Sequence, residues 1–149
     1  MGLLAGLRVS ELTESRCAVS VPFKWLNRNP FRSTFWAVLG MAAEMSTGAL
    51  VIMYTHRQSP SIATIITGTT GEFMKKAVGR TTFVCEAGDE IAAAVRRAMT
   101  SPEPVEVVCA STGLDEAGEV VAEFSFTWSM KRREDGLKND DCRLPYKDF

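Results

Sequence analysis

The sequence predicts an α+β fold in which one long helix packs against a mainly antiparallel sheet. The first observation is the segment at residues 35–54, FWAVLGMAAEMSTGALVIMY, which is apolar almost throughout and carries one formal charge, on Glu44. The second is the chain after Pro60, where four runs rich in β-branched residues are typical of strands. Helical and strand segments do not alternate as they do in a βαβ series, so a parallel sheet is not expected.

The first part of the chain predicts strand, loop and helix in that order. Apolar alternation within residues 7–23 is typical of one strand or of two short ones. Residues 24–34 contain an Asn-Pro pair and other turn-forming residues, and the residue before a proline disfavours helix, so this segment is predicted to be a loop. Ser33 or Thr34 is placed to cap the following helix, which is expected to run to about Tyr54.

The second part of the chain predicts four strands and one short helix. The helix is expected within residues 88–104, because Ile91, Val95 and Met99 recur at helical spacing and two acids stand at its start. The last two strands are expected to form a hairpin, because the segment LDEAGE between them supplies turn residues. The predicted strand runs are residues 61–73, 80–86, 104–112 and 119–128.

Length and charge indicate one folded domain that does not bind nucleic acid. The chain has 149 residues, and its 17 basic and 18 acidic residues leave a net charge of −1. No basic stripe is present that would attract a polyanion, so nucleic acid is not expected as a partner. Residues 1–131 are predicted to form a single domain. Residues 132–149 are highly charged and poor in apolar side chains, and they are predicted to form a disordered tail.

The cysteines and the single histidine argue against a metal site. Cys17, Cys85, Cys109 and Cys142 are widely spaced and form no C-x-x-C pair, so we expect reduced, buried thiols rather than disulfides or zinc ligands. With His56 as the only histidine, no metal or other cofactor is predicted. The opening residues lack the basic region and the apolar run of a secretory signal, so a cytoplasmic location is expected.

The apolar helix is long enough to cross a membrane, but Glu44 argues against it. A carboxylate at the centre of a membrane-spanning helix costs on the order of 3 kcal/mol. The amphipathic strands that follow also need an apolar surface to cover them. We therefore expect no membrane span, but a helix wrapped by a sheet, with its remaining face covered by a partner.

Two interpretations of Glu44 follow from a buried helix. In the first, the carboxylate pairs with a cation such as Arg32 or accepts backbone hydrogen bonds, because buried carboxylates are rarely tolerated unpaired. In the second, Glu44 is a general base or a nucleophile in an apolar cleft. Composition alone favours the structural interpretation.

The stretch from Asn29 to Glu44, NPFRSTFWAVLGMAAE, resembles the active-site segment of the hotdog-fold acyl-CoA thioesterases, which include 4-hydroxybenzoyl-CoA thioesterase-like and PaaI-like enzymes. In that family an Asn opens the loop before the central helix, and an Asp or Glu follows fifteen residues later, as Asn29 and Glu44 do here. The segments VPFKWLNRNPF, MAAEMSTGAL, EFMKKAVG and VVAEFSFTW resemble an uncharacterised branch of the superfamily, a domain of unknown function. The resemblance spans about residues 7–131 and implies a sheet wrapped around a central helix.

The resemblance implies roles for several residues of this chain. Glu44 is expected to act as the base for water or as the nucleophile, and Asn29 as the group that orients water or a catalytic group. Backbone N–H groups at the start of the helix, near Trp36 and Ala37, are expected to polarise the thioester oxygen.

The same resemblance implies the partners. The expected substrate is a thioester of an acyl group with CoA or with acyl-carrier protein, and the expected assembly is a homodimer or a dimer of dimers. A Ser or Thr on the strand at residues 61–73 is expected to hold water near the acid across the dimer interface, with Thr64 and Thr67 as candidates. Lys75, Lys76 and Arg80, around the turn that follows, are placed to meet the phosphates of CoA.

The chain departs from the family pattern at the start of the helix. Phe35, Trp36 and Ala37 stand where the family commonly has His-Gly-Gly, and Arg32 stands where it has an earlier glycine of the loop. The aromatic side chains are expected either to narrow the acyl pocket or to mark a protein that binds acyl groups without catalysis. The missing histidine also argues against dehydratase chemistry.

Overall fold

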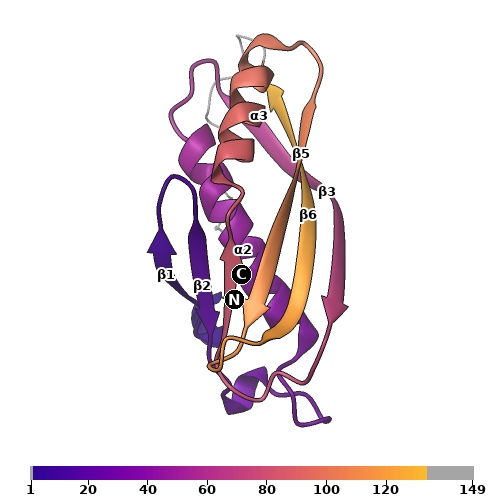
Figure 1. Cartoon of the computed structure of the whole chain (residues 1–149). Helices are drawn as coiled ribbons and strands as arrows, with labels where there is room; N and C mark the ends of the chain where they lie inside the picture. Colours follow the sequence, from indigo (N-terminus) through magenta and orange to yellow (C-terminus); the bar gives the residue numbers. More distant parts are fainter. Residues whose placement is uncertain (1, 134–149) are drawn as a thin grey trace, which may run out of the picture.

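The computed structural model describes residues 2–133, which form a six-stranded antiparallel sheet wrapped around a long helix (Figure 1). The helical elements are α1 (Gly2–Ala5), the 3₁₀ helix η1 (Trp25–Asn27), α2 (Trp36–Thr55) and α3 (Gly88–Thr100). The strands are β1 (Arg8–Leu12), β2 (Cys17–Val21), β3 (Ile62–Phe73), β4 (Thr81–Cys85), β5 (Val105–Leu114) and β6 (Val120–Arg132).

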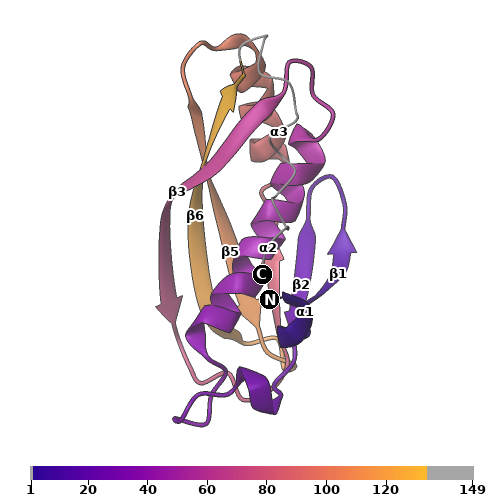
Figure 2. The ribbon, with the colours of Figure 1, turned by 180° about the vertical axis from the view of Figure 1, so that it is seen from behind.

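The strands lie in the order β1-β2-β4-β5-β6-β3, and every neighbouring pair is antiparallel. The hairpin of β1 and β2 therefore forms one edge of the sheet, and the long strand β3 forms the other, as the view from behind shows (Figure 2). The predicted α+β class is confirmed, and each predicted strand run coincides with a strand. The region at residues 7–23 forms two short strands.

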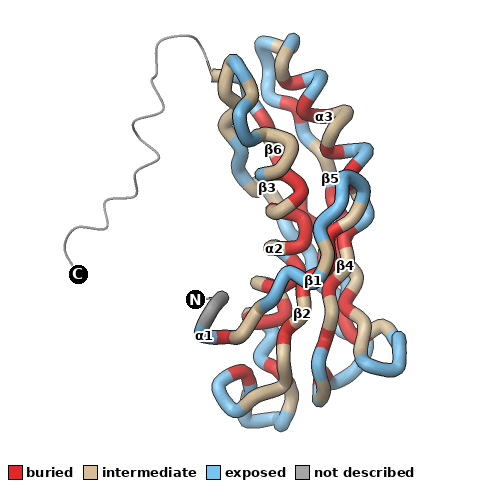
Figure 3. Tube along the Cα trace, turned by 90° about the vertical axis from the view of Figure 1, so that its left-hand side faces the viewer, coloured by how far each residue is buried: buried red, intermediate tan, exposed pale blue. Residues whose placement is uncertain are grey.

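The helix α2 packs diagonally across the concave face of this sheet, where its buried face supplies much of the core (Figure 3). Its partners on β6 include Phe124, Phe126 and Trp128, because alternate residues of a strand point to the same face. The indole Nε1 of Trp128 donates a 3.1 Å hydrogen bond to Oγ1 of Thr47. The helix has the length and mean hydropathy of a membrane-crossing helix, yet half of its most apolar window is buried within the fold.

The helix α3 lies on the same face of the sheet as α2, over β5 and β6. Its buried side chains include Ile91 and Val95, as the predicted spacing requires, and the acids Asp89 and Glu90 stand in its first turn. Negative charge in the first turn is favourable because it opposes the helix dipole. Neither α2 nor α3 covers the convex face of the sheet.

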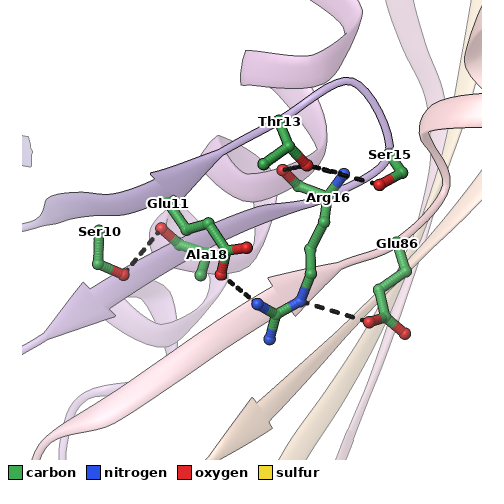
Figure 4. A network of polar contacts seen from close by, with 7 residues as sticks. All are labelled: Ser10, Glu11, Thr13, Ser15, Arg16, Ala18 and Glu86. Carbon is green, nitrogen blue, oxygen red and sulfur yellow. Dashed lines mark hydrogen bonds and ion pairs between the residues drawn. The ribbon is translucent and has the colours of Figure 1, made fainter.

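At the opposite edge, Arg16 joins the hairpin of β1 and β2 to β4 (Figure 4). Its guanidinium contacts the carboxylate of Glu11 on β1, and its Nε lies 3.3 Å from Oε1 of Glu86, directly after β4. Oγ1 of Thr13 accepts a 3.0 Å hydrogen bond from the backbone N–H of Arg16 and closes the turn. These contacts tie the mostly exposed outer strand β1 to β4 and to β2, which is buried against α2.

The thiols of the described residues are free and buried, as predicted, on Cys17, Cys85 and Cys109. Burial raises the pKa of Cys17 to about 11 and that of Cys109 to about 12. Thiols with such pKa values are inert, because the thiolate is the reactive form. Cys142 and the predicted tail lie outside the described residues, apart from Arg132 and Arg133.

Candidate functional site

The loop before α2 is held in place by the segment that follows β3. The backbone N–H of Thr34 donates to the carbonyl of Ala77 at 2.8 Å, and the Thr34 hydroxyl donates to the same carbonyl at 3.1 Å. The backbone N–H of Ala77 donates to the Ser33 hydroxyl at 3.1 Å. The prediction that Ser33 or Thr34 caps the helix is therefore wrong: both hydroxyls bind this neighbouring segment, and Phe35 occupies the N-cap position without a side-chain bond.

Asn29 organises this loop through its own side chain. Its Oδ1 accepts the backbone N–H groups of Phe31 at 3.0 Å and of Ser33 at 3.1 Å. Its carbonyl oxygen accepts the N–H of Arg32 at 3.1 Å. Because Oδ1 is used within the loop, the Nδ2 amide is the part of the side chain that remains for a substrate or a water molecule.

Arg32 holds a backbone conformation that suits glycine. Its φ angle is 59°, in the left-handed region that L-residues with a side chain rarely adopt. This position is the one where the resembled family has a glycine. Arg32 therefore carries local strain of about 1 kcal/mol.

We expect Arg32→Gly to stabilise the protein by up to about 1 kcal/mol, because glycine adopts this φ without steric cost. The measurement is the free energy of unfolding in urea. Arg28→Gly is the control: the φ of Arg28 is −86°, so glycine relieves no strain there, and the substitution should destabilise the protein through the greater entropy of the unfolded chain and the loss of the guanidinium that lies 4.4 Å from the centroid of the Phe23 ring. Equal effects of the two substitutions would contradict the assignment of strain to Arg32.

The first turn of α2 presents unused hydrogen-bond donors. Among the described residues, nothing accepts the backbone N–H groups of Trp36 and Ala37, whereas the N–H groups of Val38 and Leu39 donate to the carbonyl of Phe35. Such free N–H groups at a helix N-terminus attract negative charge. These are the two donors that the resemblance assigns to the thioester oxygen.

A hollow of about 270 Å³ opens beside the start of α2. It brings together Asn29 and Trp36 of the predicted site, and the ring of Phe35 packs edge-on against Trp36 with 6.0 Å between centroids. The lining residues are Asn29, Ser33, Thr34, Trp36, Leu39, Phe73, Met74, Lys75, Lys76 and Ala77.

Lys75, at the rim of this hollow, is already paired. Its ammonium lies 2.6 Å from Oδ2 of Asp115 and also contacts the carboxylate of Glu119, both in the hairpin between β5 and β6. Hydrogen bonding to Asp115 and Glu119 raises the pKa of Lys75, and the bond from Lys75 lowers the pKa of Asp115. Lys76 donates a 3.3 Å bond to the carbonyl of Phe31 and has no acidic partner among residues 2–133.

Glu44 does not line this hollow, and it is not buried in the protomer. It lies on a stripe of α2, here called the open stripe, defined by Ala37, Met41, Glu44, Gly48 and Ile52, which recur at helical spacing. Glu44 and Ile52 are exposed, Ala37 and Met41 are half-buried, and Gly48 is buried. In the part of the chain that the structure describes, its carboxylate makes no ion pair or hydrogen bond. The expectation of a buried acid paired with a cation such as the arginine of the preceding loop is therefore wrong for the protomer.

Gly40 and Gly48, one helical turn before and after Glu44, show which part of β6 lies beside Glu44. A Cβ atom added to Gly40 would lie 3.7 Å from the ring of Phe124, and one added to Gly48 would lie 3.5 Å from the indole of Trp128. Glu44 lies midway between these glycines along the helix. The Glu44 side chain is exposed, and its Oε1 would lie 3.7 Å from a Cβ atom added to Gly48.

Thr69 is the β3 hydroxyl at the level of Glu44. It pairs with Phe126, which lies between Phe124 and Trp128 along β6. Directly opposite residues of antiparallel strands point to the same face, so the side chain of Thr69 points to the concave side with the ring of Phe126. Thr69 is not among the hydroxyl residues that the sequence predicted for the site.

The two predicted threonines, Thr64 and Thr67, lie elsewhere on β3. Thr64 pairs with Met130, so it is on the concave face but two pairs beyond the level of Trp128. Thr67 sits at the irregularity between Ile66 and Gly68, and its hydroxyl donates to Oε1 of Glu106 on the convex face at 3.1 Å. The irregularity is a β-bulge, which adds one residue and reverses the alternation of faces beyond it.

Asn27 is a second residue that sequence reasoning missed. It is buried, and its Nδ2 donates to the carbonyls of Ala5 at 2.9 Å and Pro22 at 2.8 Å. Its own carbonyl accepts the N–H of Phe35 at 2.7 Å. Asn27 thus connects α1, the end of β2 and the start of α2. A polar residue within a predicted loop gives no signal of such burial.

The arrangement supplies a carboxylate and a pair of N–H donors on one helix, but at different levels. Glu44 is seven positions after Ala37, which corresponds to about 10 Å along the helix axis. No group of three or more His, Cys, Asp or Glu residues within residues 2–133 is arranged to hold a metal ion. The chemistry available here is that of a carboxylate and backbone dipoles.

Sequence comparison identifies the family. The model of the domain of unknown function DUF4442 matches residues 4–130. The chain belongs to this family. No functionally curated protein matches the DUF4442 chain in sequence.

Solved structures with the same architecture include proteins described as thioesterases. A Pseudomonas aeruginosa protein of unknown function, described as a "probable thioesterase", superposes with a TM-score of 0.77 at 24% identity over 88% of this chain and 86% of that chain. A Chlorobaculum tepidum protein of unknown function gives 0.76 at 15% identity over 89% and 86%. The thioesterase HI1161 of Haemophilus influenzae gives 0.64 at 11% identity over 88% and 82%. At these identities the likeness establishes the fold, and the DUF4442 chain has the hotdog fold.

Proposed function

We propose that this DUF4442 protein hydrolyses an acyl thioester of CoA or of acyl-carrier protein, with Glu44 as the catalytic carboxylate. The observation that carries the proposal is the position of Glu44: an accessible carboxylate without a partner, flanked by two glycines, on an otherwise apolar stripe of the central helix. A solvated acid on an apolar surface has no evident structural role. The fold shared with proteins described as thioesterases supports the same chemistry.

The site is proposed to be shared between two protomers. A base and the donors that polarise the carbonyl must each lie about 3 Å from reacting atoms of one thioester. Within one protomer, Glu44 and the free N–H groups of Trp36 and Ala37 are about 10 Å apart along the axis, so they cannot serve the same carbonyl. Two helices that face each other in antiparallel fashion about a two-fold axis bring the acid of one close to the start of the other.

The edge strand β3 supports the same homodimer. It has twelve residues, pairs with β6 on one side only, and is largely exposed on both faces. A long unpaired edge is a template for pairing with another strand. A partner docked there would also cover the open stripe of α2, including Met41 and Ile52. A dimer of dimers requires a further surface, for which the convex face of the sheet is available.

We expect Ile52→Glu to convert the homodimer to a monomer, because it places a charge in the proposed interface. The matched control is Val108→Glu on the convex face, which should keep the dimer, since this face could serve only a contact between dimers. Ile52 is 65% exposed in the protomer and Val108 is 62% exposed, so neither change disturbs the core. Sedimentation velocity measures the mass of each variant. A dimeric Ile52→Glu variant, or a monomeric wild type, would contradict the proposed interface.

The proposed chemistry takes one of two balanced routes. As a base, Glu44 accepts a proton from water while the hydroxide adds to the thioester carbon, and the free N–H groups of α2 stabilise the oxyanion. Collapse of this intermediate breaks the C–S bond and releases the acid and the thiol, with the proton returned to sulfur. As a nucleophile, Glu44 adds to the same carbon and expels the thiolate, and water then hydrolyses the mixed anhydride. Asn29 is proposed to orient water or the thioester through its free Nδ2.

The alternative proposal is a hotdog protein that binds acyl groups, or acts as a scaffold, without catalysis. It is favoured by the exposed Trp36, which lines the hollow where a thioester would approach the N–H groups. The T-shaped contact with Phe35 holds this ring at the helix start, where the resembled family has glycine. Under this proposal the hollow accepts an acyl chain, and Glu44 performs no proton transfer.

The decisive experiment measures free-thiol release from acyl-CoA thioesters of graded chain length by the full-length protein, in parallel with equilibrium binding of the same compounds. Release above the rate of spontaneous hydrolysis, with a preferred chain length, supports the thioesterase. Binding without release supports the non-catalytic alternative. Neither release nor binding across the panel, repeated with acyl-pantetheine as the carrier-protein mimic, would exclude both. A cytoplasmic location, where CoA thioesters are made, is part of the proposal.

A further inference from the structure

A second hollow, remote from β3, lies at the edge of the sheet formed by β1 and β2. Its volume is about 270 Å³. It carries three cationic side chains and no acidic one. The lining residues are Gly6, Arg8, Ser20, Pro22, Lys24 and Arg80.

The cations of this hollow have no acidic partner among the described residues. Arg8 opens β1 opposite Ser20, and Arg80 directly precedes β4, so both guanidinium groups reach the hollow from the sheet. Lys24 reaches it from the following loop, and its Nζ donates to the carbonyl of Leu4 at 2.5 Å. None of the three takes part in an ion pair within residues 2–133. A site with three cations and no neutralising carboxylate favours a phosphate group.

Large apolar side chains project into solvent beside this hollow. Leu4 is 68% exposed, Trp25 is 80% exposed and Leu26 is 64% exposed. Lys24 donates to the carbonyl of Leu4, and the buried Asn27 donates to the carbonyl of Ala5. These two bonds hold α1 against the segment that carries η1. Figure 2 shows α1 in the lower part of the molecule, toward the end where α2 begins, and η1 lies in the chain between β2 and α2. We name Leu4, Arg8, Lys24, Trp25, Leu26 and Arg80 the basic tip.

The sequence around Lys24, Trp25 and Leu26 of the basic tip is depleted of acid. Between Glu14 and Glu44 the chain contains no Asp or Glu, although its net charge as a whole is −1. This uninterrupted segment includes Lys24, Arg28 and Arg32. The separation of charge is therefore local, and it coincides with the exposed apolar side chains.

We propose that the basic tip binds the surface of an anionic phospholipid membrane. The hollow of Arg8, Lys24 and Arg80 takes the phosphate of a headgroup, and the side chains of Trp25 and Leu26 enter the boundary between headgroups and acyl chains. Tryptophan is enriched at that boundary because its ring is apolar while its N–H is polar. Apolar anchorage combined with attraction of Lys and Arg to anionic lipid is the usual basis of peripheral binding.

A second copy of the chain is a poorer candidate for this surface. The open stripe of α2 and the edge strand β3 already supply an extended interface, and β3 is the edge of the sheet opposite β1. A bilayer matches both features of the tip, the cations and the apolar side chains, without requiring shape complementarity. The inference does not depend on the proposed thioesterase activity.

The test is co-sedimentation of the full-length protein with vesicles of phosphatidylcholine alone or mixed with phosphatidylglycerol. We expect binding to the mixed vesicles that weakens with salt, and little binding to phosphatidylcholine alone. Trp25→Ala with Leu26→Ala is expected to weaken binding about tenfold or more, because two anchoring side chains are lost. Arg8→Gln with Arg80→Gln is expected to weaken binding to the mixed vesicles only.

Two controls are matched to these variants. Arg96→Gln with Arg97→Gln removes two exposed charges from α3, and Val108→Ala removes an exposed apolar side chain from the convex face. Both should bind vesicles as the wild type does. The proposal is overturned if the wild type fails to bind mixed vesicles, or if the α3 variant loses as much binding as the tip variant. It is also overturned if loss of Trp25 and Leu26 lowers the oligomeric mass, since a second copy would then cover the tip.

Discussion

Glu44→Gln is expected to abolish thioester hydrolysis and to leave the melting temperature unchanged. The carboxylate is exposed and has no partner among the described residues, so the amide disturbs no contact of the protomer. Glutamine can neither accept a proton from water nor form an anhydride. We expect kcat to fall by about 10³-fold or more, in the range that removal of a general base or a nucleophile produces. The measurement is thiol release at matched concentrations of folded dimer.

The control for this experiment is Glu123→Gln. Glu123 is an exposed carboxylate on the convex face of β6, opposite Glu72, and it is remote from the open stripe of α2. Its loss should leave kcat unchanged. Retained turnover in Glu44→Gln would exclude both catalytic roles of the acid. A melting temperature that fell together with the activity would instead assign Glu44 a structural role at the interface.

The elements of the fold could be predicted because their signals are local. Alternation in β5 and β6, helical spacing in α3 and the apolar length of α2 each lie within one segment of sequence. The exposure of Glu44 could not be predicted in the same way. An apolar stripe of α2 is left open because β3 is an edge strand, and strand order depends on contacts between distant segments.

The prediction of Thr64 and Thr67 as the water-holding hydroxyls of β3 missed Thr69 for a different reason. Alternation would place Thr64 and Ile66 on one face and Thr67 on the other, and it would continue unchanged to Phe73. The bulge at Thr67 reverses this order, so that Thr69 joins the face of Ile66. Gly68, directly after Thr67, is compatible with a bulge, but a glycine within a strand does not by itself specify one.

In the loop before α2, residue type and conformation disagree. Asn29 was selected through the family resemblance, and the structure adds that its Oδ1 organises the turn. Arg32 adopts a positive φ that its residue type argues against, and the contacts of Ser33 and Thr34 with Ala77 hold it there. These contacts are long-range, so the sequence could only suggest the commoner role of a helix cap.

The second large effect is expected for the hydrogen-bond donors at the start of α2. Trp36→Pro removes one free N–H, and Trp36→Ala removes the same ring but keeps the N–H. Proline is tolerated at the first position of a helix, and Phe35 already has the extended conformation, with φ −62° and ψ 131°, that precedes a proline. If this N–H polarises the thioester oxygen, Trp36→Pro should lower kcat about 10²-fold relative to Trp36→Ala. Equal activity of the two variants would assign the oxyanion to another donor.

Mixing the two defective proteins tests whether the site is shared. Under the proposed arrangement, a heterodimer of Glu44→Gln and Trp36→Pro protomers has one site with both lesions and one site with neither. The intact site combines Glu44 of the Trp36→Pro protomer with the helix start of the Glu44→Gln protomer. Random re-association makes half of the dimers mixed, so activity should return to about a quarter of the wild-type value for two-fold symmetric assembly. If each site instead used one helix alone, every site in the mixture would carry a lesion, and no activity would return.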